Sequence, residues 1–153
     1  MRLLTFILIF SFLLLTSCAK EKKSVEIIQE KDIELQMIDA YEEGIKILEE
    51  EEDGLRAAKK FSEAELLYPQ SKWAPRAALM AAYSYFSNQY YSDSIYELER
   101  FLKTYPNHPR TDYAYYLLGI VYYDQIVDET KDLESILKCK KYLEIIIKNY
   151  PNT

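Results

Sequence analysis

Apolar residues recur at steps of three and four through most of the chain beyond residue 33, which is the spacing of one buried face of an α-helix. Three of these runs end in the same dipeptide, Tyr-Pro, at residues 68–69, 105–106 and 150–151. Proline has no backbone N–H and restricts the residue before it, so each Tyr-Pro predicts the end of a helix. The apolar positions of the three runs are Ala57, Phe61, Ala64 and Tyr68; Ile95, Leu98, Phe101, Leu102 and Tyr105; and Cys139, Leu143, Ile146 and Tyr150.

A second helix is predicted before each of these runs. Residues with helix-start propensity precede two of them: Ser71 and Pro75 before one, and Thr111 and Asp112 before the other. Asp53-Gly54 is expected to separate the first pair of helices, and Asp53 is suited to cap the helix that follows. The three additional helices are expected at residues 33–50, 74–88 and 112–126.

Paired helices at this period are typical of the tetratricopeptide repeat. The prolines of successive Tyr-Pro dipeptides are 37 and 45 residues apart. Gly119 falls where the two helices of such a repeat cross closely and a side chain would separate them. The first unit has Ile45 where a small residue is usual, with Gly44 next to it. The chain is therefore predicted to be all-α, a superhelix of about three antiparallel helix pairs in units 33–71, 72–109 and 110–153.

The N-terminus has a different pattern, in which Arg2 precedes an apolar run from Leu3 to Leu15. The sequence Leu-Thr-Ser-Cys that ends at Cys18 resembles the lipobox of bacterial lipoproteins. An uncleaved membrane helix is the alternative, but the run reaches roughly 20 Å, short of a bilayer core of about 30 Å. We therefore expect a signal peptide at residues 1–17 and a lipidated N-terminus and charged tether at 18–32. Cys18 would carry N-acyl and S-diacylglycerol lipid, and we expect no other cofactor and no metal.

The charge and the cysteine and histidine content of the chain limit the classes of partner and chemistry to expect. Of 19 basic residues, Arg2 leaves with the signal peptide, so 18 face 25 acidic residues. A net acidic chain gains nothing from phosphate contacts, so we expect no nucleic-acid partner. The chain has two cysteines, and a lipid on Cys18 leaves Cys139 as a small core residue without a disulfide. The single histidine, His108, lies in a turn and is interpreted as structural, and we expect no enzyme because no catalytic motif is present.

The whole mature chain resembles the BamD family, the tetratricopeptide lipoproteins of the outer-membrane β-barrel assembly machinery. The stretches that carry this resemblance follow the lipobox in order: 41–44, 61–69 (FSEAELLYP), 105–109 (YPNHP), 122–126 (YYDQI) and 150–153 (YPNT). Family members usually have five repeats, so we expect a chain truncated after the third. The resemblance implies BamA and other assembly-machinery lipoproteins as partners. It also implies unfolded outer-membrane protein precursors as clients, and a lipid anchor on the periplasmic face of the outer membrane of a Gram-negative bacterium.

The first helices of stacked repeats line the concave side, and their inward positions predict a binding groove. The groove is aromatic with one cation near its edge, which suits an extended peptide with aromatic residues and a terminal carboxylate. The C-terminal strand of an unfolded outer-membrane protein is the client that the family resemblance implies. Each tyrosine has the alternative role of sealing contacts between helices. The groove candidates are Arg76, Leu79, Tyr83, Phe86, Tyr113, Tyr116, Ile120 and Tyr123.

The first unit has acidic inward positions and a run of acids from Glu49 to Asp53. This run is interpreted as a solvated helix end, with an acidic docking edge as the alternative. Two other functions remain open for the chain as a whole. One is a cell-envelope tetratricopeptide adaptor that coordinates peptidoglycan synthesis with outer-membrane constriction. The other is a lipoprotein enzyme or accessory factor of wall hydrolysis.

Overall fold

The computed structural model describes residues 30–128 and 132–151. The predicted signal peptide, Cys18 and nearly all of the predicted tether lie outside these residues. Six α-helices and one π-helical turn form the described part of the chain. Their bounds are α2 (Glu30–Lys46), η2 (Ile47–Glu51), α3 (Gly54–Leu67), α4 (Ala74–Ser87), α5 (Tyr91–Thr104), α6 (Thr111–Asp124) and α7 (Leu133–Asn149).

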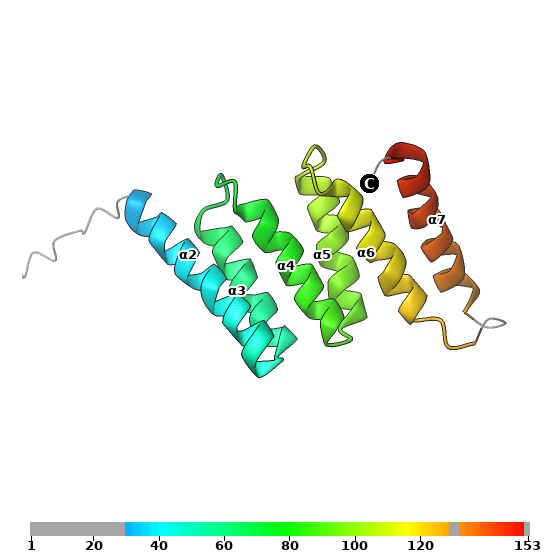
Figure 1. Ribbon diagram of the computed structural model, residues 1–153, viewed down its shortest axis with the longest axis horizontal. Coiled ribbons are helices and arrows are strands. Elements are labelled where there is room, and N and C mark those ends of the chain that lie inside the picture. Colours follow the sequence, from blue (N-terminus) through cyan, green and yellow to red (C-terminus); the bar gives the residue numbers. More distant parts are fainter. Residues whose placement is uncertain (1–29, 129–131, 152–153) are drawn as a thin grey trace, which may run out of the picture.

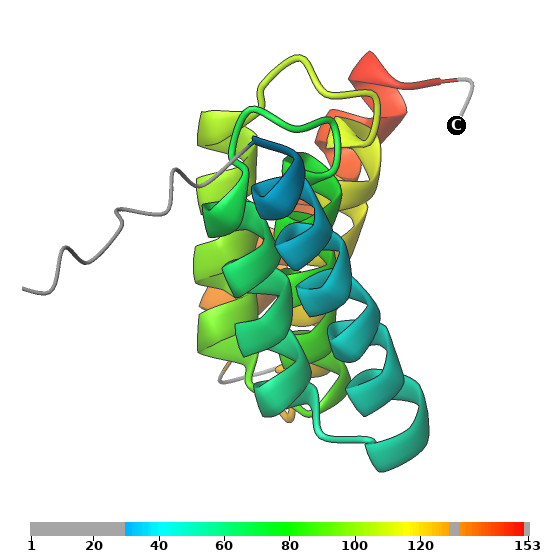
Figure 2. The ribbon, with the colours of Figure 1, turned by 90° about the vertical axis from the view of Figure 1, so that its left-hand side faces the viewer.

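The helices stand side by side in chain order, and neighbours run in opposite directions (Figure 1). Each helix packs on the next, and α4 also contacts α6, so the first helices of the second and third pairs are neighbours. Turned by 90°, the stack shows α3 and α5 on one side and α2 on the other (Figure 2). The predicted all-α superhelix of three antiparallel pairs is confirmed.

The three Tyr-Pro dipeptides end helices as predicted. α3, α5 and α7 stop directly before Tyr68, Tyr105 and Tyr150, whose φ and ψ angles are no longer helical. The N–H of Tyr105 still donates to the carbonyl of Phe101 over 2.8 Å, which closes the last turn. The following proline has no N–H with which to continue the helix.

Helix starts and ends differ from the sequence predictions by a few residues. The first helix begins at Glu30 and its predicted last turn is π-helical. The first helix of the third pair, α6, ends at Asp124, two residues before the predicted end at residue 126. At this point the side-chain amide of Gln125 donates to the carbonyl of Val121. Asp53 caps α3 as predicted, because its carboxylate accepts from the N–H of Arg56 over 3.0 Å.

Ser71 and Thr111, two of the predicted start signals, lie two residues before and one residue after the cap position of their helices. The hydroxyl of Ser71 accepts from the N–H of Trp73 within the connecting turn, so Trp73 becomes the cap residue of α4. The hydroxyl of Thr111 donates to the carbonyl of His108, and Thr111 is itself the first residue of α6. Both side chains therefore shape the turn before the helix instead of capping the helix.

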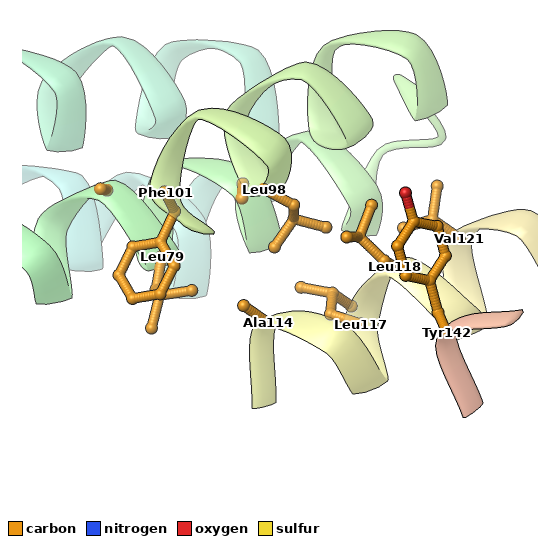
Figure 3. Close-up of a cluster of buried hydrophobic side chains, with 10 residues drawn as sticks. Leu79, Leu98, Phe101, Ala114, Leu117, Leu118, Val121 and Tyr142 are labelled. Atoms are coloured by element: carbon orange, nitrogen blue, oxygen red, sulfur yellow. The ribbon is translucent and has the colours of Figure 1, made fainter. Parts of the chain in front are cut away.

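The largest core cluster joins the second and third pairs (Figure 3). It fills the space where α4, α5, α6 and α7 meet. Leu98 and Phe101, which the periodicity predicted on the apolar face of the second run, are fully buried in it, and so is most of Leu79, which was predicted for the groove. Gly119 lets α6 approach α7 because an added Cβ would lie 2.9 Å from Cδ2 of Leu143. Gly44 provides the close approach to Phe61 in the first unit, which explains why Ile45 is tolerated beside it. Cys139 is buried, as predicted.

A buried acid links the first unit to the second. Glu65 on α3 is 5% exposed, and its carboxylate accepts two hydrogen bonds from the Arg100 guanidinium of α5, over 2.9 and 2.5 Å. The Tyr105 hydroxyl donates to the same carboxylate over 2.8 Å. Glu97 also pairs with Arg100. These four residues, the Glu65 network, connect second helices of neighbouring units.

None of the helices in residues 30–128 and 132–151 combines the length and apolarity needed to cross a membrane.

Candidate binding cavity on the first helices

A cavity of about 400 Å³ opens on the face formed by α2, α4 and α6. Three segments far apart in the sequence build it: α2, α4, and the α5–α6 turn with the start of α6. Its walls are mostly aromatic and aliphatic, with two arginines. The lining residues are Tyr41, Arg76, Leu79, Met80, Tyr83, His108, Pro109, Arg110 and Tyr113.

A chain of edge-to-face aromatic contacts leads from the core to Arg76 at the cavity. The guanidinium carbon of Arg76 lies 4.9 Å from the centre of the Trp73 ring, within the range of a cation–π contact. Trp73 in turn meets Tyr41 edge to face at 5.7 Å, and Tyr41 meets the buried Phe61 at 5.2 Å. The charge of Arg76 is therefore held beside an aromatic column that reaches the core.

Backbone hydrogen bonds fix the α5–α6 turn, which contributes the second arginine. The His108 N–H donates to the carbonyl of Tyr105 over 3.1 Å, and the Thr111 N–H donates to the carbonyl of His108 over 3.0 Å. The His108 ring meets Phe101 edge to face at 5.6 Å. Its Nδ1 accepts from the Arg110 N–H over 3.2 Å. His108 therefore has the structural contacts that its place in the turn predicted, and it also lines the cavity.

The permanently charged side chains of the cavity lining are both positive. Arg76 and Arg110 line the cavity, and no acidic residue is among the lining residues. Burial, and then the two arginines, hold the pKa of His108 below its ordinary value. Burial raises the pKa of Tyr113, with smaller contributions from Tyr83 and Tyr116. An anion that enters the cavity therefore meets two arginines, and no carboxylate belongs to the lining of this cavity.

The structure brings half of the predicted groove residues together at this cavity. Arg76, Leu79, Tyr83 and Tyr113 line it, and Tyr116 lies beside Tyr113 with ring centres 6.4 Å apart. Leu79 is 7% exposed, so most of its side chain belongs to the core.

The other three predicted residues are outside the cavity lining. Phe86 packs against Tyr91 at 6.4 Å and against the core cluster. Ile120 and Tyr123 lie farther along α6, where Tyr123 is 62% exposed and Ile120 is half-buried. These positions extend the same face toward the end of α6.

A second hollow of about 330 Å³ continues from the first along α2. Tyr41 lines both, and Trp73 forms part of the second. Apart from Glu42, its lining side chains are apolar or aromatic: Met37, Ile38, Tyr41, Ile45 and Trp73. The cationic cavity is thus adjacent to an apolar one.

Two residues of the acidic run of the first unit, Glu51 and Asp53, make local contacts. Glu51 pairs with Arg56, and Asp53 caps the helix that contains Arg56. Glu52 adopts a left-handed backbone conformation, with φ of 54°, which ends the π-helical turn. These contacts agree with the interpretation of the run as a solvated helix end.

Comparisons with known proteins identify relatives over most of the chain. A family model described as the outer membrane lipoprotein YfiO matches residues 33–153. The chain is 33% identical over 137 residues to the outer membrane protein assembly factor BamD of Caulobacter vibrioides, which covers 89% of this chain and 43% of that protein. It is 31% identical over 141 residues to BamD of Rickettsia prowazekii, covering 92% of this chain and 53% of the relative.

A shorter match, 34% identical over 70 residues, relates 46% of the chain to 26% of BamD of Neisseria gonorrhoeae. The chain spans about half the length of the first two curated relatives. The family model nevertheless covers all three helix pairs of the described fold. The family resemblance seen in the sequence is confirmed: the chain belongs to the BamD (YfiO) family of outer membrane lipoproteins.

Proposed function

We propose that the chain is a non-catalytic subunit of the outer-membrane β-barrel assembly machinery. Its relatives are named outer membrane protein assembly factors, which supports this role. In the proposal, lipid on Cys18 anchors the chain to the periplasmic face of the outer membrane, and no resident cofactor takes part. BamA and other lipoproteins of the machinery are the proposed stable partners, and unfolded outer-membrane proteins are the clients.

The client would bind through its C-terminal segment. The observation that carries this proposal is the cavity in which Arg76 and Arg110 stand beside aromatic side chains without an acid. A guanidinium forms strong, paired hydrogen bonds with a carboxylate, and aromatic walls add contact area at a small loss of side-chain entropy. A peptide that is rich in aromatic residues and ends in a free carboxylate satisfies both requirements.

The partner proposal is tested by affinity purification from detergent-solubilised envelopes. We expect the tagged chain to recover BamA together with other subunits of the machinery. A tagged lipoprotein of unrelated fold serves as the control for non-specific capture. Recovery of division or wall-synthesis proteins without BamA would instead support the adaptor function and refute this one.

The peptide proposal is tested by combining Tyr83→Ala with Tyr116→Ala. The two tyrosines are 38% and 49% exposed on the first-helix face, so their rings are available to a ligand and contribute little to the core. Each lost aromatic contact weakens binding by roughly 1 kcal/mol, so we expect at least a tenfold loss of affinity for a C-terminal barrel peptide. Calorimetric titration measures this loss, and circular dichroism should show unchanged helicity.

Tyr96→Ala is the matched control for that double variant. Tyr96 is 65% exposed on α5 and does not line the cavity. It should therefore leave the peptide affinity unchanged. Equal affinities of the double variant and the parent chain would place the peptide elsewhere.

A further inference from the structure

The cavity holds one group that titrates near neutral pH. Arginine and tyrosine, the other ionisable residue types of the lining, have ordinary pKa values far above neutrality. His108 is the remaining titratable residue of the lining. The acid closest to it in sequence, Asp112, is not part of the lining, and its carboxylate accepts from the N–H of Tyr113 over 2.7 Å.

The surroundings of His108 disfavour its protonated form. Burial is the larger cause of its lowered pKa, and the charges of Arg76 and Arg110 add to it. The Arg110 N–H also donates to Nδ1, and this hydrogen bond requires the unprotonated nitrogen. A carboxylate bound between the arginines would offset their field and favour the imidazolium.

We propose that His108 is the third basic group of this anion site, and that binding of a peptide's terminal carboxylate is accompanied by proton uptake at His108. This inference rests on the proposed peptide-binding function and adds the pH dependence of that binding. Arg76 comes from α4 and Arg110 from the α5–α6 turn, so the site forms only when neighbouring repeats are stacked. Its ligand class is a peptide with a free C-terminal carboxylate.

The sign of the linkage follows from the two states of the site. The pKa of His108 is lower in the free chain than in the complex, so affinity rises as pH falls through the interval between the two values. If the pKa of His108 differs by one between the free chain and the complex, the affinity changes at most tenfold over this interval. Loss of the Arg110 N–H bond on protonation opposes the effect, so we expect the complex to be about three- to tenfold tighter at pH 5.5 than at pH 8.

The test uses a decapeptide ending in phenylalanine, as the free acid and as the C-terminal amide, with the full chain in detergent. The chain has one histidine, so its ring C–H resonance reports the pKa of His108 directly by NMR. The acid peptide should raise this pKa and bind more tightly at pH 5.5, whereas the amide should do neither. His108→Gln should bind the acid peptide with an affinity that no longer depends on pH in this range.

The outcomes separate the inference from the proposed function. If the acid peptide binds at both pH values with equal affinity and leaves the His108 pKa unchanged, the proton linkage is refuted and the peptide function stands. If acid and amide bind equally, the carboxylate site itself is refuted. If neither peptide binds at either pH, both the function and the inference are overturned. The NMR readout on the unmodified chain does not depend on how well the glutamine variant folds.

Discussion

Gly54→Ala is expected to lower the free energy of unfolding by about 3 kcal/mol or more, at the upper end of the effects of overpacking. An added Cβ at Gly54 would lie 2.2 Å from the backbone oxygen of Ser84 and 2.7 Å from Cγ of Asn88. The nearest atom belongs to the backbone of α4, so no change of side-chain rotamer relieves the clash. The Gly54 N–H also donates to the Asn88 side chain over 2.7 Å, and this bond would be displaced with it.

Gly119→Ala is the matched control, since it also adds one methyl group at a close helix crossing. There the nearest atom is the end of a flexible side chain, Cδ2 of Leu143 at 2.9 Å, which can move. For Gly119→Ala we expect the free energy of unfolding to fall by about 1 kcal/mol, which is a smaller loss than for Gly54→Ala. For Gly54→Ala the corresponding fall in Tm is roughly 10 °C. Thermal unfolding followed by circular dichroism measures both. The gain in helix propensity from glycine to alanine is the same in both variants and cancels in the comparison. Equal Tm values for the two variants would therefore contradict the close α3–α4 contact at Gly54.

The helices were predictable because their signals are local. A periodic apolar face and a proline after tyrosine act within a few residues, and neither depends on what the helix packs against. The close approach at Gly119 was predictable for a related reason, since a helix pair must cross where side chains are small. In the first unit the close approach is at Gly44, one residue before the position that the repeat pattern indicates. Helix ends shifted where a side chain found a backbone partner, as at Gln125. Such a choice depends on the geometry of one turn.

The cavity was only partly predictable, because the repeat pattern assigns inward positions to first helices and leaves the turns unassigned. Arg110 and His108 lie in the α5–α6 turn, so the pattern gave them no place in the groove. Phe86 was placed there by its helical position, but its ring packs against Tyr91 of the next helix. Whether a turn residue lines the cavity, and whether a ring is buried by the next helix, depends on how the helix pairs stack.

The Glu65 network was missed for the same reason. Glu65 follows Phe61 and Ala64 on α3, so its burial could have been suspected from the helical spacing. Its partners Arg100 and Tyr105 lie 35 and 40 residues away on the next unit. No local pattern pairs an acid with an arginine at that distance.

Glu65→Ala is expected to lower the free energy of unfolding by about 2–3 kcal/mol. Removing one partner of a buried charge pair leaves the other uncompensated, with losses of about 3–5 kcal/mol for fully buried pairs. The Arg100 side chain is 30% exposed, so water screens part of this loss. The Tyr105 hydroxyl also loses its acceptor. Urea unfolding monitored by circular dichroism measures the change, with Glu63→Ala as the matched control.

Glu63 lies two residues away on the same helix and pairs with Lys60 at the surface, so its loss should change stability by less than about 0.5 kcal/mol. A second readout is the phenol of Tyr105. Burial, and then the hydrogen bond to the Glu65 carboxylate, raise the pKa of Tyr105 to about 12. The signal of Tyr105 is isolated by subtracting the tyrosinate absorbance of the Glu65→Ala, Tyr105→Phe double variant from that of Glu65→Ala. In the Glu65→Ala variant the Tyr105 phenol should ionise at a lower pH than in the parent chain, although burial still holds its pKa above the ordinary value. If Glu65→Ala unfolds at the same urea concentration as Glu63→Ala and leaves the Tyr105 pKa near 12, the network does not join the first two repeats energetically.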